Sequence, residues 1–400
     1  MEFIKNVINE PVNNVQRFLD FKINKQDFIN EMDFIISKIE EMSEEFSDDV
    51  FPSAVTMKNK YSQEFNGGGW TQGFWSGMIW LAYEWTDDEK YKKIGESHVQ
   101  SFKKRLDGRL GIDHHDLGFL YSLSCVAPYK INGNEEAKKV AIGAADYLSR
   151  RYVKSIGIID RGKRPGIIPD DESQFIIDCS MNVHLLFWAS EVTGNPKYYQ
   201  MAYEHMKQAA EHALREDAST FQEVNFNKNT GKVVAKTVGQ GYSDTSSWAR
   251  GQAWAIYGFA LTYGYTKDKG MLEIARKMAN YYLNRLPDDD ICGWDLVFTE
   301  NDCQRDTSAA TPAICGLLEL SKHLPVSDSD KMIYEKAALK MLKTLSKHYT
   351  TKKIPHSNGI LLHGVYAYKR NTNIDDLCIW GDYFYTEALM RVLKVWNKYW

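Results

Sequence analysis

Three stretches of the chain repeat one pattern, and this repeat restricts the fold more than any other feature of the sequence. Each stretch has an apolar, aromatic-rich run, a short polar turn, and a second run with hydrophobic residues at helical spacing. They read WSGMIWLAYEWTDDEKYKKIGESH, LLFWASEVTGNPKYYQMAYEH and IYGFALTYGYTKDKGMLEIARK. The turn residues end one helix and start the next. The repeat therefore predicts helical hairpins, which bury their apolar helices against one another.

The two helices of each hairpin differ in their hydrophobic pattern. The second helix carries one apolar face, as the positions Tyr91, Val99 and Phe102 show, and one face is therefore buried. The first helix is apolar nearly all round, as in the run from Met78 to Tyr83. A helix of that kind is enclosed by other helices. We therefore expect inner and outer helices.

The same pattern extends along the whole chain. It predicts six inner helices, near residues 73–85, 117–127, 181–193, 248–264, 308–322 and 380–396. It also predicts six outer helices, near residues 26–45, 88–106, 135–151, 197–214, 270–286 and 330–348. Strand-like alternation is confined to short stretches such as 220–226 and 360–368.

These twelve helices favour an all-α fold, an (α/α)6 barrel of six inner helices surrounded by six outer ones. No Gly/Ser/Pro-rich linker divides the chain, so we expect one barrel domain over residues 1–400, with 1–25 as an N-terminal lead-in. An open superhelix of stacked hairpins is the alternative, because it follows the same packing rules.

Polar residues gather where the inner helices begin. If each inner helix follows an outer one, all six begin at the same end of the barrel. Some of these residues are expected to cap helices, but the set also brings His and Arg to this end. Its members are His114, His115, Asp116, Asp178, Ser180, Ser243, Asp244, Arg250, Arg305, Asp306, Asp375, Asp376 and Asp382.

Asp116 and Asp178 are the candidate catalytic pair. They precede neighbouring inner helices, so we expect them to face each other across a pocket. Two close carboxylates in a partly dry cleft have separated pKa values, and one stays protonated near neutral pH. A carboxylic acid of that kind is the general acid of sugar cleavage. The chain also has 11 Trp, 23 Tyr and 18 Phe, which can supply apolar platforms for sugar rings.

Other functional classes have little support in the sequence. The formal charge of −4 does not indicate nucleic acid or an anionic membrane as a partner. The ten His include no H-E-x-x-H pattern, so no metal is expected, and no phosphate-binding glycine loop or G-x-G-x-x-G indicates a cofactor. The six cysteines form no C-x-x-C pair, which indicates reduced thiols.

Within the first 25 residues, charged side chains interrupt every apolar stretch. We therefore expect neither a signal peptide nor a membrane span, and we expect the protein to be cytoplasmic. A monomer or small homo-oligomer is expected.

From about residue 65 onward, the chain resembles the unsaturated glucuronyl hydrolases of glycoside hydrolase family 88. The resemblance is carried by GFWSG at 73–77, HDLGF at 115–119, IDC at 177–179, SWARGQAW at 247–254, DTSAA at 306–310 and WGDY at 380–383. It implies the same barrel, and an intracellular activity on oligosaccharides that polysaccharide lyases produce. These substrates end in a 4,5-unsaturated uronic acid.

The resemblance also implies roles for individual residues. Asp178 would protonate C4 of the vinyl ether while water adds at C5, and Asp116 would hold water, substrate hydroxyls or the charge state of Asp178. The first sugar would be contacted by Trp70, His115, Gln240, Arg250, Trp254 and Tyr366. Arg250 suits the uronate carboxylate, because a guanidinium can bind it with two charge-assisted hydrogen bonds.

Two positions depart from the family pattern. Some members have His where this chain has Gln222, so contacts with the uronic hydroxyls differ there. Members that favour sulfated fragments carry Ser-x-x-Ser-x-Lys where this chain has Ala367, Arg370 and Thr372. Lys369 and Arg370 can still supply positive charge, which leaves the sulfation preference open.

Three other functions remain as alternatives. The first is an unsaturated rhamnogalacturonyl hydrolase, which would act on pectin-derived disaccharides with the same barrel and a similar aspartate. The second is a conventional glycosidase or a sugar epimerase, which would act on saturated sugars. The third is a non-catalytic sugar-binding barrel, in which Asp178 would not be needed.

Overall fold

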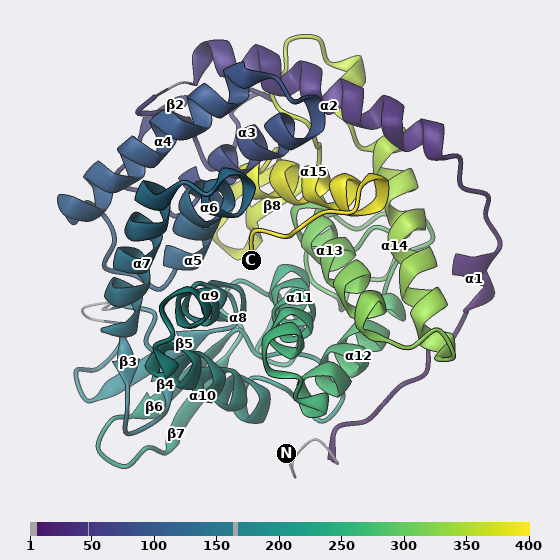
Figure 1. Cartoon of the computed structure of the whole chain (residues 1–400). Coiled ribbons are helices and arrows are strands. Elements are labelled where there is room, and N and C mark those ends of the chain that lie inside the picture. The colour runs from purple at the N-terminus through teal and green to yellow at the C-terminus, as the bar shows by residue number, and fades with distance from the viewer. Residues whose placement is uncertain (1–5, 47, 163–166) are drawn as a thin grey trace.

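The computed structural model describes residues 6–46, 48–162 and 167–400. Within these ranges, two concentric layers of helices form a ring (Figure 1). The inner layer contains α3 (Gln72–Thr86), α5 (Leu117–Tyr121) with η2 (Ser122–Val126) and α6 (Ala127–Asn132), α8 (Cys179–Asn182) with α9 (His184–Thr193), α11 (Ala249–Thr266), α13 (Thr307–His323) and α15 (Ile379–Leu393).

The outer layer contains α2 (Lys25–Glu45), α4 (Glu89–Asp107), α7 (Glu135–Ser149), α10 (Pro196–His212), α12 (Lys269–Leu283) and α14 (Ser329–His348). The ring closes where α15, the last helix in chain order, packs against both α13 and α3. The predicted (α/α)6 barrel is confirmed, and the alternative, an open superhelix, is excluded because the ring is closed.

The short turns between inner and outer helices have a common construction. The α3–α4 and α11–α12 turns end the inner helix with a left-handed residue, Asp87 or Lys267. The next residue, Asp88 or Asp268, caps the outer helix through its side chain. Such a cap satisfies a backbone N–H that would otherwise be unpaired. Polar turn residues therefore end one helix and start the next, as the sequence predicts.

Aromatic side chains fill the axis of the barrel. Phe119 lies 5.2 Å from Trp254 and 6.0 Å from Trp400, measured between ring centroids. Trp400 stacks on Phe384 with an interplanar angle of 12°, and its indole Nε1 donates a hydrogen bond to Glu387. The chain end thus lies at the centre of the ring (Figure 1), where it fills the barrel on the side away from the inner-helix N-termini.

Two inner helices are interrupted, and both begin next to a candidate catalytic aspartate. The second inner helix contains the π-helical segment η2, which precedes Pro128. Proline has no N–H to donate to the preceding turn, and a π-bulge is one way to accommodate it. The third inner helix is divided at Val183, between α8 and α9.

The strands all lie in connections that lead from an outer to an inner helix, so they share one end of the barrel. β5, β6 and β7 form a three-stranded antiparallel sheet in that order, and the other strands form two-stranded pairs. The strands and short 3₁₀ helices are β1 (Val50–Pro52), β2 (Gln63–Phe65), β3 (Tyr152–Val153), β4 (Ile158–Ile159), β5 (Glu172–Ile176), β6 (Glu223–Asn227), β7 (Val233–Thr237), η3 (Thr351–Lys353), β8 (Gly364–Ala367), η4 (Tyr368–Arg370) and β9 (Thr372–Asp376).

The described part of the N-terminal segment contains α1 (Gln16–Leu19) and runs along the outer layer. Arg17 pairs with Asp290 at 2.6 Å, and Glu10 pairs with Arg285 at 2.9 Å. These contacts attach the segment to the barrel. Across the described ranges, none of the helices combines the length and the apolar character needed to span a membrane.

Candidate active site

A pocket of about 190 Å³ opens at the end of the barrel where the inner helices begin. Eight of the nine residues nominated from the sequence line it: Trp70, His115, Asp116, Asp178, Gln222, Gln240, Arg250 and Tyr366. Ile176, Glu223 and Ala367 also line it, together with two cationic residues, Arg161 and Arg370. The connections before five of the six inner helices contribute to this wall.

Trp254, the ninth nominated residue, does not line the pocket. It is fully buried on α11, and its ring packs 5.2 Å from Phe119 and 5.3 Å from Phe384. α11 is buried on nearly all sides, so its hydrophobic pattern does not show which residues face a cavity. Trp254 lies within the aromatic core of the barrel.

Asp116 and Asp178 stand at the N-termini of α5 and α8, but neither side chain caps its helix. Both carboxylates are instead part of the pocket wall. Asn182 links the two residues, because its Nδ2 lies 3.1 Å from Asp116 Oδ1 and 3.2 Å from the backbone oxygen of Asp178. Gly118 allows this close approach, since a Cβ there would lie 2.4 Å from Asn182 Cα.

The two carboxyl groups have opposite pKa shifts. Burial, followed by the negative charge of Asp116, raises the pKa of Asp178 to about 7. Burial alone would also raise the pKa of Asp116, but His115, His114 and Arg161 outweigh it and lower this pKa to about 2. Near neutral pH the pocket therefore holds one ionised carboxylate beside a carboxyl group that can still carry a proton.

Asp178 Oδ2 is buried and has no hydrogen-bond partner in the described part of the chain. Burying a polar atom without a partner costs free energy. Such an atom beside a pocket is suited to contact a ligand or a water molecule. The carboxyl group of Asp178 therefore lies where a proton donor would be needed, and its pKa of about 7 lets it carry a proton near neutral pH.

Two histidines flank Asp116. His115 Nε2 lies 3.4 Å from Asp116 Oδ1, and His114 Nδ1 lies 3.5 Å from Asp116 Oδ2. Burial lowers the pKa of His115 to about 4, so this ring is uncharged at neutral pH. A neutral imidazole can donate one hydrogen bond and accept another, which suits contact with both a carboxylate and a sugar hydroxyl.

Arg250 is more tightly held than the sequence indicates. Its side chain is 2% exposed, and its guanidinium lies between the rings of Trp248 and Trp380. Nη1 donates to the backbone oxygen of Val365, and Nη2 donates to that of Tyr366 at 2.9 Å. Both terminal nitrogens therefore hold the β8 backbone against α11.

Glutamine and aromatic side chains complete the wall. Gln222 Nε2 donates to Gln240 Oε1 at 2.7 Å, and the Gln240 backbone N–H donates to Gln222 Oε1 at 2.7 Å. Gln240 Nε2 donates to the backbone oxygen of Tyr366 at 3.1 Å. The Trp70 indole nitrogen lies 3.4 Å from the Tyr366 hydroxyl. The glutamine part and the aromatic part of the pocket wall therefore both contact Tyr366 on β8.

Other polar residues of this rim have structural roles or lie elsewhere. Asp306 caps α13 through Ser308, and Asp382 accepts hydrogen bonds from the backbone of Ile360 and Leu361. Arg305 and Asp375 line a different cavity, of about 620 Å³. Helix capping therefore accounts for Asp306 but not for the aspartates of the pocket.

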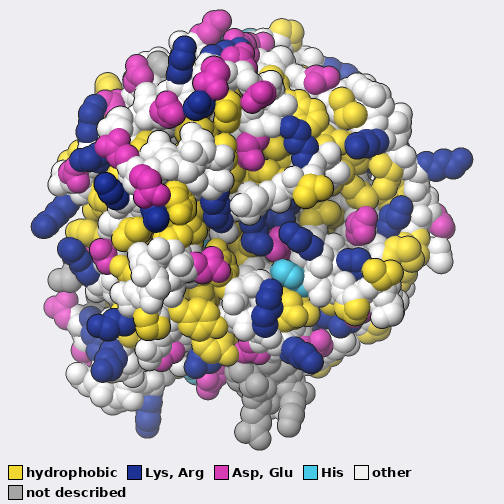
Figure 2. All heavy atoms as spheres, in the orientation of Figure 1, with side chains coloured by type: hydrophobic (Ala, Val, Ile, Leu, Met, Phe, Trp, Pro, Cys, Tyr) yellow, Lys and Arg dark blue, Asp and Glu magenta, His cyan; other side chains and the backbone are white. Residues whose placement is uncertain are grey.

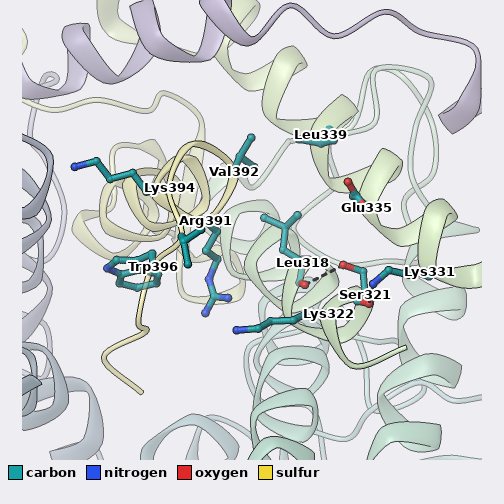
Figure 3. A pocket seen from close by; sticks show the side chains of 11 residues that line it. Leu318, Ser321, Lys322, Lys331, Glu335, Leu339, Arg391, Val392, Lys394 and Trp396 are labelled. Atoms are coloured by element: carbon teal, nitrogen blue, oxygen red, sulfur yellow. Dashed lines mark hydrogen bonds between the residues drawn. The ribbon is translucent and has the colours of Figure 1, made fainter. Parts of the chain in front are cut away.

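A third cavity, of about 390 Å³, lies at the opposite end of the barrel, between the ends of α13 and α15 (Figure 3). Two of its charged residues have protein partners: Arg391 binds Glu319 and Glu387, and Lys331 donates to the backbone oxygen of Ser321. Acidic and basic side chains are interspersed over the face seen in Figure 2. Neither of these two cavities is lined by a residue that the sequence nominates as catalytic or substrate-binding.

Over the described ranges of the chain, no group of three or more His, Cys, Asp and Glu side chains is arranged to hold a metal ion. The six cysteines are all free thiols, and Cys303 is the one that is not fully buried.

Comparison with known proteins gives consistent results along almost the whole chain. Residues 37–376 match the family described as Glycosyl Hydrolase Family 88. The chain is 42% identical over 403 residues to the unsaturated chondroitin disaccharide hydrolase of Streptococcus pneumoniae, covering 99% of this chain and 100% of that protein.

Solved structures also match this chain over nearly its whole length. The unsaturated glucuronyl hydrolase of Streptococcus agalactiae matches with a TM-score of 0.94 at 40% identity, covering 98% of this chain and 99% of that one. A mutant of that enzyme complexed with dGlcA-GalNAc6S matches with a TM-score of 0.87 at 39% identity and the same coverage of both chains.

Proposed function

The chain belongs to glycosyl hydrolase family 88, and from that premise we propose that it is an unsaturated glucuronyl hydrolase. It removes the 4,5-unsaturated uronic acid from the non-reducing end of lyase-generated glycosaminoglycan oligosaccharides. The observation that carries this proposal is that one pocket holds Asp178, whose pKa burial raises to about 7, together with Asp116, whose pKa is lowered to about 2. The reaction needs a group of this kind, because it begins by protonating a carbon atom near neutral pH.

The mechanism uses Asp178 as both acid and base. Its carboxyl group donates a proton to C4, the C4–C5 double bond is consumed, and positive charge develops at C5 and the ring oxygen. Water then bonds to C5 and returns a proton to the Asp178 carboxylate. The hemiketal formed at C5 opens, and the remaining sugar is released from C1. Asp116 stays ionised and stabilises the developing positive charge.

The remaining pocket residues bind and orient the sugar in this proposal. His115, Gln222 and Gln240 offer polar atoms for the hydroxyl groups, while Trp70 and Tyr366 provide aromatic surface. Aromatic rings present an apolar face with a polar edge, which suits a sugar ring. Trp254, which lies within the core, supports this surface through Phe119.

Asp178→Asn tests the mechanism. The amide keeps the shape of the side chain but cannot donate and recover the proton, so we expect turnover to fall by several orders of magnitude. Turnover is measured as loss of the ultraviolet absorbance of the unsaturated disaccharide. Asp382→Asn is the matched control, because Asp382 is buried with a pKa raised to about 7 but lies outside the pocket. Near-normal activity of a folded Asp178→Asn protein would contradict the mechanism.

We further propose unsaturated chondroitin disaccharides as the preferred substrates. The Streptococcus pneumoniae relative is named for these substrates, and the Streptococcus agalactiae enzyme has been crystallised with dGlcA-GalNAc6S. Arg370, which lines the pocket and is exposed, can contact a sulfate on the second sugar, whereas Lys369 lies outside the lining. Comparing sulfated and unsulfated chondroitin, hyaluronan and heparin disaccharides would rank them. Preference for a pectin-derived disaccharide would overturn this choice.

Finally, we propose that the enzyme works in the cytoplasm as one catalytic domain, in a monomer or small homo-oligomer. The free thiols are compatible with a reducing compartment. The contacts of residues 6–24 with α12 and α14 support their inclusion in the domain. Cell fractionation, limited proteolysis and light scattering would test the location, the domain boundary and the oligomeric state.

A further inference from the structure

Arg161 is a cation of the pocket that no pattern in the sequence marks. It follows β4, and its backbone N–H donates to the backbone oxygen of Gln174 at 2.8 Å. Its Nη1 donates to Gln174 Oε1 at 2.9 Å and to Glu223 Oε1 at 3.1 Å. These bonds hold the side chain against β5 and β6 at the pocket wall.

Part of the Arg161 guanidinium is available for a ligand. Both of its side-chain bonds use Nη1, and neither Nη2 nor Nε has a hydrogen-bond partner among the described residues. The side chain retains 20% exposure. A guanidinium offers five N–H groups in a planar fork that matches a carboxylate or a sulfate.

Arg161 also lies within electrostatic reach of the catalytic pair. Its positive charge lowers the pKa of both Asp116 and Asp178. An anionic group bound by Arg161 would therefore lie close to the reacting carboxyl groups.

Arg250, the cation expected to hold the uronate, is less available. Its Nη1 and Nη2 already donate to backbone oxygens of β8, and its Nη1 lies 3.6 Å from Asp306. Arg370 is exposed, and no side-chain hydrogen bond or ion pair within the described residues holds it in place. Of the three arginines that line the pocket, Arg161 is the one whose side chain is fixed by hydrogen bonds to Gln174 and Glu223 while Nη2 and Nε remain available to a ligand.

We propose that Arg161 binds an anionic oxygen group of the substrate, either the uronate carboxylate or a sulfate, and thereby determines specificity. This inference rests on the proposed function for the identity of the substrate. Glu223 keeps the guanidinium in place, because its carboxylate also accepts a hydrogen bond from Thr237 and is itself held in the sheet. The substrate anion would bind Nη2 and Nε of Arg161, because the bond to Glu223 uses Nη1.

Binding to an inactive protein tests the contact without relying on turnover. We would measure the affinity of Asp178→Asn for the unsulfated unsaturated chondroitin disaccharide, with and without Arg161→Gln, by titration calorimetry. Losing a charge-assisted contact should weaken binding roughly 10- to 150-fold. Arg161→Lys should recover part of the loss. The matched control is Arg276→Gln, a partly buried, ion-paired arginine on α12, which should leave binding unchanged.

Two further ligands show whether Arg161 binds the carboxylate or a sulfate. They also distinguish a direct contact of Arg161 with the ligand from a purely structural role. The methyl ester of the disaccharide lacks the carboxylate charge, so Arg161→Gln should weaken its binding much less if the carboxylate is the group bound. If the loss appears only with a sulfated disaccharide, the sulfate is the group bound. Equal loss for charged and neutral ligands would show a structural role and overturn the inference, as would no loss with any ligand.

Wild-type turnover in the same preparation tests the proposed function separately. A wild-type protein that hydrates the disaccharide while Arg161→Gln binds it normally would refute the role of Arg161 alone. A protein that binds the disaccharide through Arg161 without turnover would refute the activity alone. Absence of binding to the Asp178→Asn protein together with absence of wild-type turnover would overturn both.

Discussion

Asp178→Asn should make the protein more stable, and the gain should grow with pH. In the folded chain, the pKa of this carboxyl group is raised from 3.8 to about 7, first by burial and then by Asp116. Between these two values the folded state binds more protons than the unfolded state. The contribution of Asp178 to stability therefore falls as the pH rises through this window, and it levels off above the folded pKa.

The size of the effect follows from the two pKa values. Relative to a side chain that is always neutral, Asp178 costs about 2 kcal/mol at about pH 5.5 and about 4 kcal/mol at about pH 8.5. Any effect of the substitution that does not depend on pH cancels in the comparison. The gain in the free energy of unfolding from Asp178→Asn should thus be larger by about 2 kcal/mol at the higher pH. Asp116 does not contribute to this difference, because its lowered pKa leaves it ionised in both conditions.

Urea unfolding of the wild-type and variant proteins at the two pH values measures this difference. Asp382→Asn provides a comparison, since burial raises the pKa of Asp382 to about 7 as well. Both variants should show the same pH-dependent gain, but only Asp178→Asn should lose activity. A stability change for Asp178→Asn that is equal at both pH values would refute the raised pKa and, with it, the argument that Asp178 is protonated near neutral pH.

Two further predictions concern the same part of the pocket. Asp116→Asn removes a negative charge that raises the pKa of Asp178, so the basic limb of the pH profile of kcat/KM should move to lower pH. An unmoved limb would mean that the two groups are not coupled. Gly118→Ala should destabilise the protein by about 1–3 kcal/mol, because its Cβ would lie 2.4 Å from Asn182 Cα. Gly68→Ala, which meets no atom within 4 Å, is its control in thermal unfolding, and equal effects of the two would contradict the close-packing argument.

Local signals in the sequence were sufficient to predict the twelve helices of the barrel. The α3–α4 turn shows why: Asp87 adopts a left-handed conformation and Asp88 caps the next helix, and Asp tolerates the first conformation and is favoured as a cap. The division of the third inner helix at Val183 was not predicted, because its apolar pattern continues across the break. Periodicity reports which residues are buried, not whether a helix is continuous.

The candidate site was predicted less completely than the helices. Residues that the order of the helices brings together were predicted, whereas residues placed by long-range contacts were not. Asp116 and Asp178 precede inner helices, so the fold itself brings them to one rim. Arg161 lies in a loop, and the pairing of β5 with β6 brings it to the pocket, which no local pattern indicates. The partners of Arg250 are 115 and 116 positions away on β8. Hydrogen bonds over such separations depend on the assembled barrel.

The position of α15 has a consequence for the synthesis of the protein. The ring closes where this last helix packs against α3, one of the earliest helices in chain order. Until α15 has left the ribosome, α3 and α13 lack a neighbour, and their apolar surfaces stay exposed. Contacts between distant parts of a chain form slowly, and exposed apolar surface favours aggregation. We therefore expect the nascent barrel to bind chaperones, and its yield in the cell to depend on how quickly translation of the last inner helix is completed.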